Sequence, residues 1–298
     1  MTGRAYPSPA AFKQALEARL RADATRTGRA LPRQRQLVVF DRFLARVMET
    51  LGERVIVKGG VVLELRLTRA RTTKDVDLRV LGDPAALEAQ LRAACSLDLG
   101  DHLGFEIRPD PEHPTIEGEG IIYAGRRFRA SARLAGKPYG DHFGVDAGFA
   151  DRLVDAPEII TGSAFLEFAG IAPPQFRVYP RESHVAEKLH AYSLPRSREN
   201  TRVKDLPDIA LLALTGPFDA PRLRDALDAT FTFRGTHTLP TTLPAPPIAW
   251  AAPYARIAQS DGLPWPTLDA VTEAARAFLD PVLRGGAQSW DSTAWCWR

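Results

Sequence analysis

Two carboxylates lie two residues apart in a short alternating segment of the chain. Asp75 and Asp77 alternate with the apolar Val76 and Leu78, a pattern typical of a β-strand. Side chains two residues apart on a strand project from one face, so both carboxylates point to the same side. They repel each other unless a cation lies between them, and oxygen ligands are those that Mg²⁺ prefers. The pair therefore indicates a divalent-metal site, although a strand with a polar, solvated face shows the same pattern.

A short strand, a glycine pair and a helix are predicted just before these carboxylates. Residues 54–57 include β-branched side chains, Gly59 and Gly60 follow, and residues 61–66 can form a helix. Glycines let the backbone approach a ligand closely, and the N–H groups of a helix N-terminus favour a phosphate. A tight turn would explain the glycine pair alone equally well. The order of strand, glycine turn, helix, basic loop and carboxylate strand predicts a nucleotide phosphate site.

Cations close to these elements could balance the charge of a triphosphate. The loop before the carboxylates carries Arg69, Arg71 and Lys74, which would otherwise form a solvated charged loop. Lys188 falls at the edge of the inward stripe of a helix predicted over residues 182–193. A lysine in that position either extends its ammonium group to solvent or meets an anion. Lys188 is therefore a candidate contact for a triphosphate oxygen.

Two more aspartates are candidates for the same site. Asp146 lies between two glycines in a predicted strand, on the face opposite its apolar side chains. Three carboxylates converging on one sheet face could hold two Mg²⁺ ions and favour attack on the α-phosphate of an NTP. Asp205 is spaced from Asp208 like a helix N-cap and its acidic N3 partner, which would explain Asp205 without chemistry. A surface position on the strand would likewise explain Asp146.

The N-terminal part of the sequence predicts the elements that position these residues. Two amphipathic helices are expected over residues 8–22 and 32–51. Asp83 and Pro84 predict the start of another helix, as its N-cap and its first helical residue. β-Structure is expected across residues 102–149, where apolar and polar side chains alternate.

The C-terminal part is expected to be mostly helical. The predicted helices cover residues 182–193, 205–215, 219–229 and 267–283. Residues 235–253 are proline-rich and predict an extended connector. The predicted fold class is therefore α/β (α+β), a mixed β-sheet with flanking helices plus a mostly helical C-terminal half. Residues 1–165 would form the N-terminal helices and the core, and residues 166–298 a helical domain that completes the site.

Composition excludes several classes of protein. The 298 residues include 39 Lys+Arg and 36 Asp+Glu, and the net charge of +3 excludes a histone-like polyanion binder but allows a local basic site. Cys95 and Cys296 form no CxxC motif, which excludes a disulfide scaffold and a cysteine zinc site. His184 and His190 have no visible triad partners and are expected to be surface or packing residues. Without a long apolar run or a signal-peptide pattern, a cytoplasmic location and no membrane partner are expected.

Four segments, in this order, resemble the motifs of a known family. They are Val57-Lys-Gly-Gly60, Arg71-Thr-Thr-Lys-Asp-Val-Asp-Leu78, Glu187-Lys-Leu-His-Ala191 and Arg202-Val-Lys-Asp-Leu-Pro-Asp208. The family is that of the AbiEii/AbiGii-type toxin nucleotidyltransferases of type IV toxin–antitoxin and abortive-infection systems. It belongs to the DNA polymerase beta-like nucleotidyltransferase superfamily, so the resemblance implies a nucleotidyltransferase fold.

The resemblance implies a role for each matching residue. Asp75 and Asp77 match the metal-binding aspartates, with Asp146 as a third metal ligand, and the metal would be Mg²⁺ or Mn²⁺. Lys188 matches a lysine that contacts the nucleotide phosphates, and Asp205 matches an acidic active-site residue. Asp75, Asp77, Lys188 and Asp205 would thus form the catalytic group.

A second set of residues would bind the nucleotide. Gly59 and Gly60 match the phosphate turn of the superfamily, in which the second position here is Gly where Ser also occurs. Thr73 matches a small hydroxyl residue near the metal pair. Arg71 and Lys74 lie beside it in the basic loop. Together with the lysine of the helix, these residues would hold the NTP substrate.

The resemblance also implies an acceptor and a partner. The acceptor would be RNA, in particular the 3′ end of tRNA, and a cognate antitoxin would be encoded nearby. A predicted strand face of Arg127, Arg129 and Arg133 is a candidate acceptor contact, although it also fits an ordinary solvated face. Two alternatives stay open: transfer to a protein or a small molecule, and a catalytically silent nucleotide-binding regulator.

Overall fold

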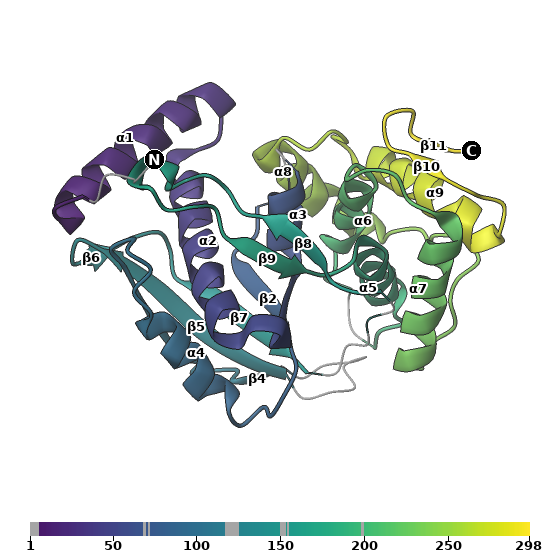
Figure 1. Cartoon of the computed structure of the whole chain (residues 1–298). Coiled ribbons are helices and arrows are strands. Elements are labelled where there is room, and N and C mark those ends of the chain that lie inside the picture. The colour runs from purple at the N-terminus through teal and green to yellow at the C-terminus, as the bar shows by residue number, and fades with distance from the viewer. Residues whose placement is uncertain are drawn as a thin grey trace.

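A mixed β-sheet with helices packed against it forms the N-terminal part of the chain (Figure 1). The structure is a computed structural model that describes residues 6–67, 70, 72–116, 125–149, 153, 155–197 and 200–298. Arg69 and Arg71 of the predicted basic loop lie outside the described residues. The observed architecture is the predicted mixed sheet with flanking helices.

The strand order places the two predicted carboxylates in the middle of the sheet. Across the sheet the order is β3-β5-β7-β2-β1-β9-β8, and β4 and β6 pair with β5. β2 runs antiparallel to β1 and parallel to β7. The strands are β1 (Val55–Lys58), β2 (Asp75–Val80), β3 (Leu103–Pro109), β4 (Thr115–Ile116), β5 (Gly125–Leu134), β6 (Lys137–Pro138), β7 (Phe143–Gly148), β8 (Glu158–Thr161) and β9 (Gln175–Val178). β2 has the predicted bounds, because its apolar and polar side chains alternate throughout.

Helices cover the apolar face of the sheet and leave the other face polar. They are α1 (Pro9–Thr27), α2 (Leu31–Leu51), α3 (Gly60–Arg66) and α4 (Leu87–Ser96). Phe40 and Phe43 of α2 each lie with ring centroids 5.2 Å from that of Phe143 on β7. Val76 and Leu78 of β2 are fully buried in the same core. Because strand side chains alternate, the neighbouring aspartates of β2 face away from this core.

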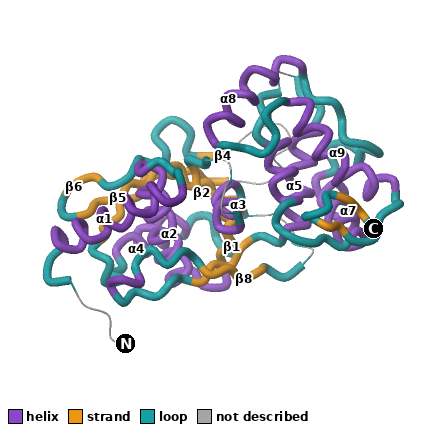
Figure 2. The backbone as a smooth tube through the Cα atoms, turned by 90° about the horizontal axis from the view of Figure 1, so that it is seen from above, coloured by secondary structure: helices purple, strands orange, loops and turns teal. Residues whose placement is uncertain are grey.

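The C-terminal part of the chain is a group of helices with its own buried core. It contains α5 (Arg181–Ser193), α6 (Asp205–Ala213), α7 (Ala220–Arg234), α8 (Ala251–Asp261), α9 (Leu268–Arg284) and a hairpin of β10 (Trp290–Asp291) and β11 (Cys296–Trp297). Figure 2 shows α5, α7 and α9 to one side of the sheet, with α3 and β1 between the two groups. Leu63 of α3 is buried in the helical core, so α3 joins the two parts.

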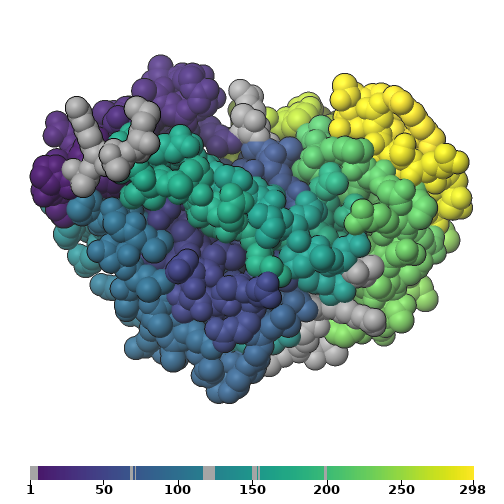
Figure 3. All heavy atoms as spheres, viewed as in Figure 1, coloured from purple at the N-terminus to yellow at the C-terminus, as the bar shows by residue number. Residues whose placement is uncertain are grey.

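A single segment runs across the front of the molecule from one part to the other. β8 and β9, drawn in teal, extend from beside the purple N-terminal helices to the green helices that follow (Figure 3). Val178 of β9 belongs to the N-terminal core, and Val185 of α5 belongs to the helical core. The two cores thus divide between these residues, whereas the domain boundary predicted between residues 165 and 166 stays a prediction.

Two local predictions are wrong. The helix expected to begin at Asp83 begins at Leu87, because the Asp83 carboxylate accepts a hydrogen bond from the Ala85 N–H in a turn. The segment 235–253, expected to be extended, already enters α8 at Ala251. Proline in the first turn of a helix is compatible with helical structure, so Pro253 does not prevent α8 from forming.

Candidate active site

The sheet brings the three predicted carboxylates together on its polar face. In the register of β2 and β7, Asp77 lies directly opposite Asp146, and Asp75 lies opposite Gly144. Asp77 also lies opposite Lys58 of β1. Residues paired across neighbouring strands have side chains on the same face, so Asp75, Asp77 and Asp146 share one surface.

Two glycines make room for these carboxylates. Gly59 has φ +70°, and a Cβ there would lie 1.8 Å from Asp77 Oδ2. A Cβ at Gly144 would lie 2.5 Å from Asp75 Oδ1. Any larger residue would displace a carboxylate, and the positive φ of Gly59 adds a second requirement for glycine. Gly60 is the buried first residue of α3 and lies beside this turn.

Asp146 is bound to an arginine of the next strand. Arg127 Nε donates to Asp146 Oδ1 at 2.8 Å, and Arg127 Nη2 donates to Asp146 Oδ2 at 2.7 Å. Within the described residues, no three acidic, histidine or cysteine side chains are arranged as a ready-made metal site. Arg127 therefore balances the charge of Asp146 and occupies one lone pair on each of its oxygens, which leaves acceptor sites on both oxygens.

Burial and neighbouring charge raise the pKa of Asp77 to about 6. Burial has the largest effect, followed by repulsion from Asp146, while the attraction of Lys58 and Lys188 opposes the rise. A carboxylate held close to other carboxylates favours a cation in its vicinity. The donor set of Asp75 and Asp77 thus fits a divalent metal ion.

A cavity of about 290 Å³ opens beside Asp77, between the sheet and the helical part. Its cations come from separate elements, namely Lys58 of β1, Arg127 of β5, Lys188 of α5, Arg202 before α6 and Arg234 of α7. Gly59, Asp146 and Asp205 also line this cavity. Such a concentration of cations next to carboxylates is suited to an NTP with a divalent metal.

Lys188 lies in this cavity and is held by two aspartates of α6. Its Nζ is 2.9 Å from Asp205 Oδ1 and 2.8 Å from Asp208 Oδ2. The predicted capping role of Asp205 is wrong, because Lys204 occupies the N-cap position and this described segment has no side-chain cap. The second oxygen of Asp205, Oδ2, is buried without a hydrogen-bond partner among the described residues. Asp205 thus contributes charge to the cavity.

Thr73 supports the backbone of the carboxylate strand. Its Oγ1 donates to the Asp75 carbonyl at 3.2 Å, and its own carbonyl accepts from Arg33 Nη1 at 2.8 Å. Glu64 accepts the Thr73 N–H at 3.1 Å and forms an ion pair with Arg33. Thr73 is buried, whereas Lys74 is exposed on the far side of the carboxylates from Lys188. The two residues of the predicted nucleotide loop thus lie in different surroundings.

Several residues of the cavity were not identified from the sequence. Glu187 accepts from the Tyr179 hydroxyl at 3.0 Å and lies 3.5 Å from Lys58 Nζ. Glu187 directly precedes Lys188 on α5, and both residues line the cavity. Lys58 could have been identified from the sequence, because it directly precedes the glycine pair in the Val57–Gly60 motif.

His184 forms part of the cavity wall, and His190 packs elsewhere. Each is 1% exposed, so both are packing residues and not surface residues. Burial, with a smaller effect from Lys188, lowers the pKa of His184 to about 3, so its ring is neutral. Neither ring nitrogen of His184 has a hydrogen-bond partner in the described part of the chain. His190 instead lies 2.8 Å from Thr236 Oγ1.

The geometry and the motifs agree with a comparison with known families. Residues 42–292 match the family described as "Nucleotidyl transferase AbiEii toxin, Type IV TA system". The chain belongs to the AbiEii family of nucleotidyltransferase toxins. The match spans both parts of the chain, from α2 to β10, and includes every predicted site residue.

The fold is similar to that of a solved toxin structure. MenT4, a nucleotidyltransferase toxin from Mycobacterium tuberculosis H37Rv, is 18% identical, with 91% of this chain and 98% of that chain covered and a TM-score of 0.51. The JHP933 protein from Helicobacter pylori is 15% identical, with 67% and 80% covered and a TM-score of 0.38. No curated protein matches this AbiEii chain significantly in sequence. None of its helices in the described ranges is long and apolar enough to cross a membrane.

Proposed function

We propose that this AbiEii-family chain transfers a nucleoside monophosphate from an NTP to an RNA acceptor, the 3′ end of tRNA. The observation that supports this most is the convergence of Asp75, Asp77 and Asp146 beside a cavity lined with cations. The similar MenT4 chain is named a nucleotidyltransferase toxin. As members of this family belong to type IV toxin–antitoxin systems, we also propose a cognate antitoxin as partner and a cytoplasmic location.

Asp75 and Asp77 would hold Mg²⁺, or Mn²⁺ in its place, because they share one face of β2 and oxygen ligands are those that these ions prefer. When bound, the metal would neutralise charge on the triphosphate. The raised pKa of Asp77 and the space left by Gly59 support this assignment. Asp146 would join them through the lone pairs that Arg127 leaves free.

The chain's own residues would orient the two substrates. Lys58, Lys188 and Arg202 would bind the triphosphate in the 290 Å³ cavity. The acceptor oxygen then forms a bond to the α-phosphorus, and the bond from that phosphorus to the bridging oxygen breaks. Pyrophosphate leaves with the electron pair, and a carboxylate takes the hydroxyl proton. Such a reaction depends mainly on positioning and on charge neutralisation.

The test is direct incorporation of label. The purified chain is incubated with Mg²⁺, total tRNA and each of the four NTPs labelled at the α-phosphate. We expect labelled tRNA with at least one NTP, and none in the presence of EDTA. Absence of labelled RNA with all four NTPs, from folded protein, would overturn the proposal. Label found on a protein or small molecule would favour the first alternative, and NTP binding without turnover would favour a regulator.

A further inference from the structure

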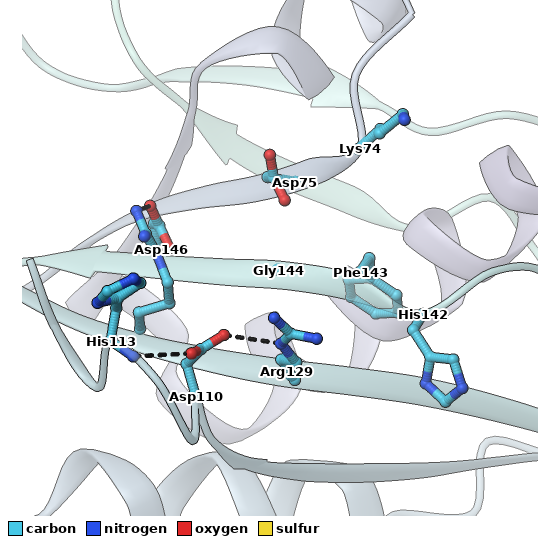
Figure 4. Close-up of a pocket in the computed structure, with 10 residues that line it drawn as sticks. Lys74, Asp75, Asp110, His113, Arg129, His142, Phe143, Gly144 and Asp146 are labelled. Atoms are coloured by element: carbon cyan, nitrogen blue, oxygen red, sulfur yellow. Dashed lines mark hydrogen bonds and ion pairs between the residues drawn. The ribbon is translucent and has the colours of Figure 1, made fainter.

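A second cavity lies on the other side of the carboxylates from the first. It has a volume of about 410 Å³, and its lining includes Lys74, Asp75, Asp110, His113, Arg129 and His142 (Figure 4). Arg127 and Asp146 line both cavities and so form the wall between them. A transfer reaction needs two substrates that meet at one reacting centre. Two cavities that share the carboxylate wall provide that arrangement.

The polar groups of this second cavity are arranged on a fixed frame. Arg129 Nε donates to Asp110 Oδ2 at 2.7 Å, and Asp110 Oδ1 accepts the backbone N–H groups of Glu112 and His113 at 2.9 Å each. These bonds tie the loop after β3 to β5. Among the described residues only Nε of Arg129 is engaged, its side chain is 51% exposed, and Arg129 lines the cavity, so the rest of its guanidinium is available there.

Three further side chains line this cavity without a side-chain bond to the rest of the described chain. Lys74 is exposed and forms no ion pair with a described residue, and His113 and His142 are also exposed. Figure 4 shows Lys74 and His142 at one end of the cavity and His113 at the other, with Asp75 between them. The cavity thus offers cations for a phosphate and flat imidazole rings for a base.

We propose that this second cavity binds the 3′-terminal nucleotide of the acceptor RNA, an inference that rests on the proposed function. Arg129 and Lys74 bind the phosphate that precedes the terminal ribose, and His142 stacks on a base. The terminal hydroxyl then lies beside Asp75 and Asp146. Arg133, which was a third candidate on the same strand face, lies outside this cavity, with its Nε 3.6 Å from Glu106. Lys74 is thereby assigned to the acceptor and not to the NTP.

The test separates the two substrates kinetically. Lys74→Ala and His142→Ala remove exposed side chains that form no bond with the described chain, so both variants should fold. Lys137→Ala is the matched control, because Lys137 is an exposed lysine on the same sheet that lines neither cavity. We expect each test variant to raise the KM for tRNA about tenfold, which corresponds to the loss of one charge-assisted contact or one stacking contact. The KM for the NTP should change less than about twofold by the same reasoning.

Binding without turnover gives a second readout. Anisotropy of labelled tRNA, measured without NTP, should show weaker binding for Lys74→Ala. The slope of the logarithm of the binding constant against the logarithm of the salt concentration should decrease in magnitude by about one. An unchanged KM for tRNA in both variants, with wild-type transfer intact, would overturn this inference and leave the proposed function standing. A rise in the KM for the NTP instead would also overturn it. Failure of the wild-type chain to label any RNA would overturn the proposed function itself.

Discussion

Two aspartates of this chain, the fully buried Asp101 and the half-buried Asp77, have opposite electrostatic surroundings. Asp101 lies in the N-terminal core, where Arg46 contacts both of its oxygens at 2.8 and 2.7 Å and Arg42 Nε adds a bond at 2.8 Å. Burial alone would raise the pKa of Asp101, but the two arginines outweigh it and lower that pKa. Asp77 has Asp146 and Asp75 as neighbours, and its pKa rises to about 6.

The comparison indicates that the charge of Asp101 stabilises the fold, whereas the charge of Asp77 is available to a ligand. At Asp101 every opposing charge comes from the protein, and the cluster is closed to solvent. At Asp77 the cations that attract the carboxylate are shared with other acids, because Lys58 also pairs with Glu187 and Lys188 pairs with Asp205 and Asp208, and the surface opens into a cavity. A half-buried charge whose counter-charges are shared in this way is costly to fold, so its persistence is consistent with a ligand that balances it.

The largest expected effect is a loss of stability when the buried cluster of Asp101, Arg42 and Arg46 is changed. Asp101→Asn leaves Arg46 buried without its counter-charge and leaves Arg42 with the more distant Asp41 at 3.8 Å, and we expect the free energy of unfolding to fall by about 3–5 kcal/mol. Urea denaturation measures this change. Asp98→Asn, an exposed substitution in the same loop, is the control and should leave stability nearly unchanged. Equal stability of Asp101→Asn and wild type would show that the Asp101 cluster does not stabilise the fold.

The next effect concerns Asp77, whose substitution should lower the rate of transfer and not the stability. Asp77→Asn removes a charge that we propose binds the metal, and we expect kcat/KM to fall by about 100- to 1000-fold. The free energy of unfolding should not fall, because the substitution also removes repulsion from Asp146. Label transfer to tRNA and thermal unfolding of the same preparation measure both quantities. A stability loss as large as that of Asp101→Asn would contradict the distinction.

A smaller effect is expected from the ion pair that supports the strand of Asp75. Glu64→Gln weakens the hold on the Thr73 N–H and on Arg33, so the carboxylate strand is positioned less accurately. We expect kcat to fall about tenfold while the KM for the NTP stays within about twofold. The control is Glu49→Gln, since Glu49 is exposed on α2 and distant from this loop. An unchanged kcat would contradict a positioning role for Glu64 and leave it only a role in stabilising the fold.

The smallest effect is a pH dependence of the metal-free chain. Because the folded pKa of Asp77 lies above its ordinary value of 3.8, the folded state binds more protons than the unfolded state between pH 3.8 and about 6. Asp77 therefore makes the chain less stable as pH rises through this window. Relative to wild type, Asp77→Asn should become more stable from pH 4 to 7. Urea titrations at several pH values test this, and a difference that stays constant with pH would contradict the raised pKa.

The sequence predicts the parts of the site that depend on neighbouring residues, but not those that depend on contacts between distant segments. Alternation in β2 is a local property, so Asp75 and Asp77 could be placed on one strand face from the sequence. The proximity of Asp146 to Asp77 was a hypothesis, since it depends on parallel pairing of two strands that are far apart in the chain. The bidentate bond to Arg127 depends on the register of β5 and β7, which no local pattern encodes. It therefore emerged only from the structure.

The helical part shows the same limit. The position of Lys188 at the edge of an apolar stripe was visible in the sequence, but its two partners were interpreted as a cap. Spacing at Asp205 and Asp208 fits a capping box, and only the packing of α5 against α6 shows that both carboxylates bind the lysine. Tertiary contacts thus overrode a local signal of the kind that usually predicts helix ends.

The parallel pairing of β2 with β7 has a consequence for the time at which the site forms. Asp77 and Asp146 are separated by the whole meander of β3 and β5, and Lys188 meets its aspartates only after α6 has been made. Closing such long loops is entropically costly and slows folding. A nascent chain on the ribosome therefore has no complete site until Arg234 of α7 has left the exit tunnel. Synthesis itself thus delays the formation of the site in this toxin.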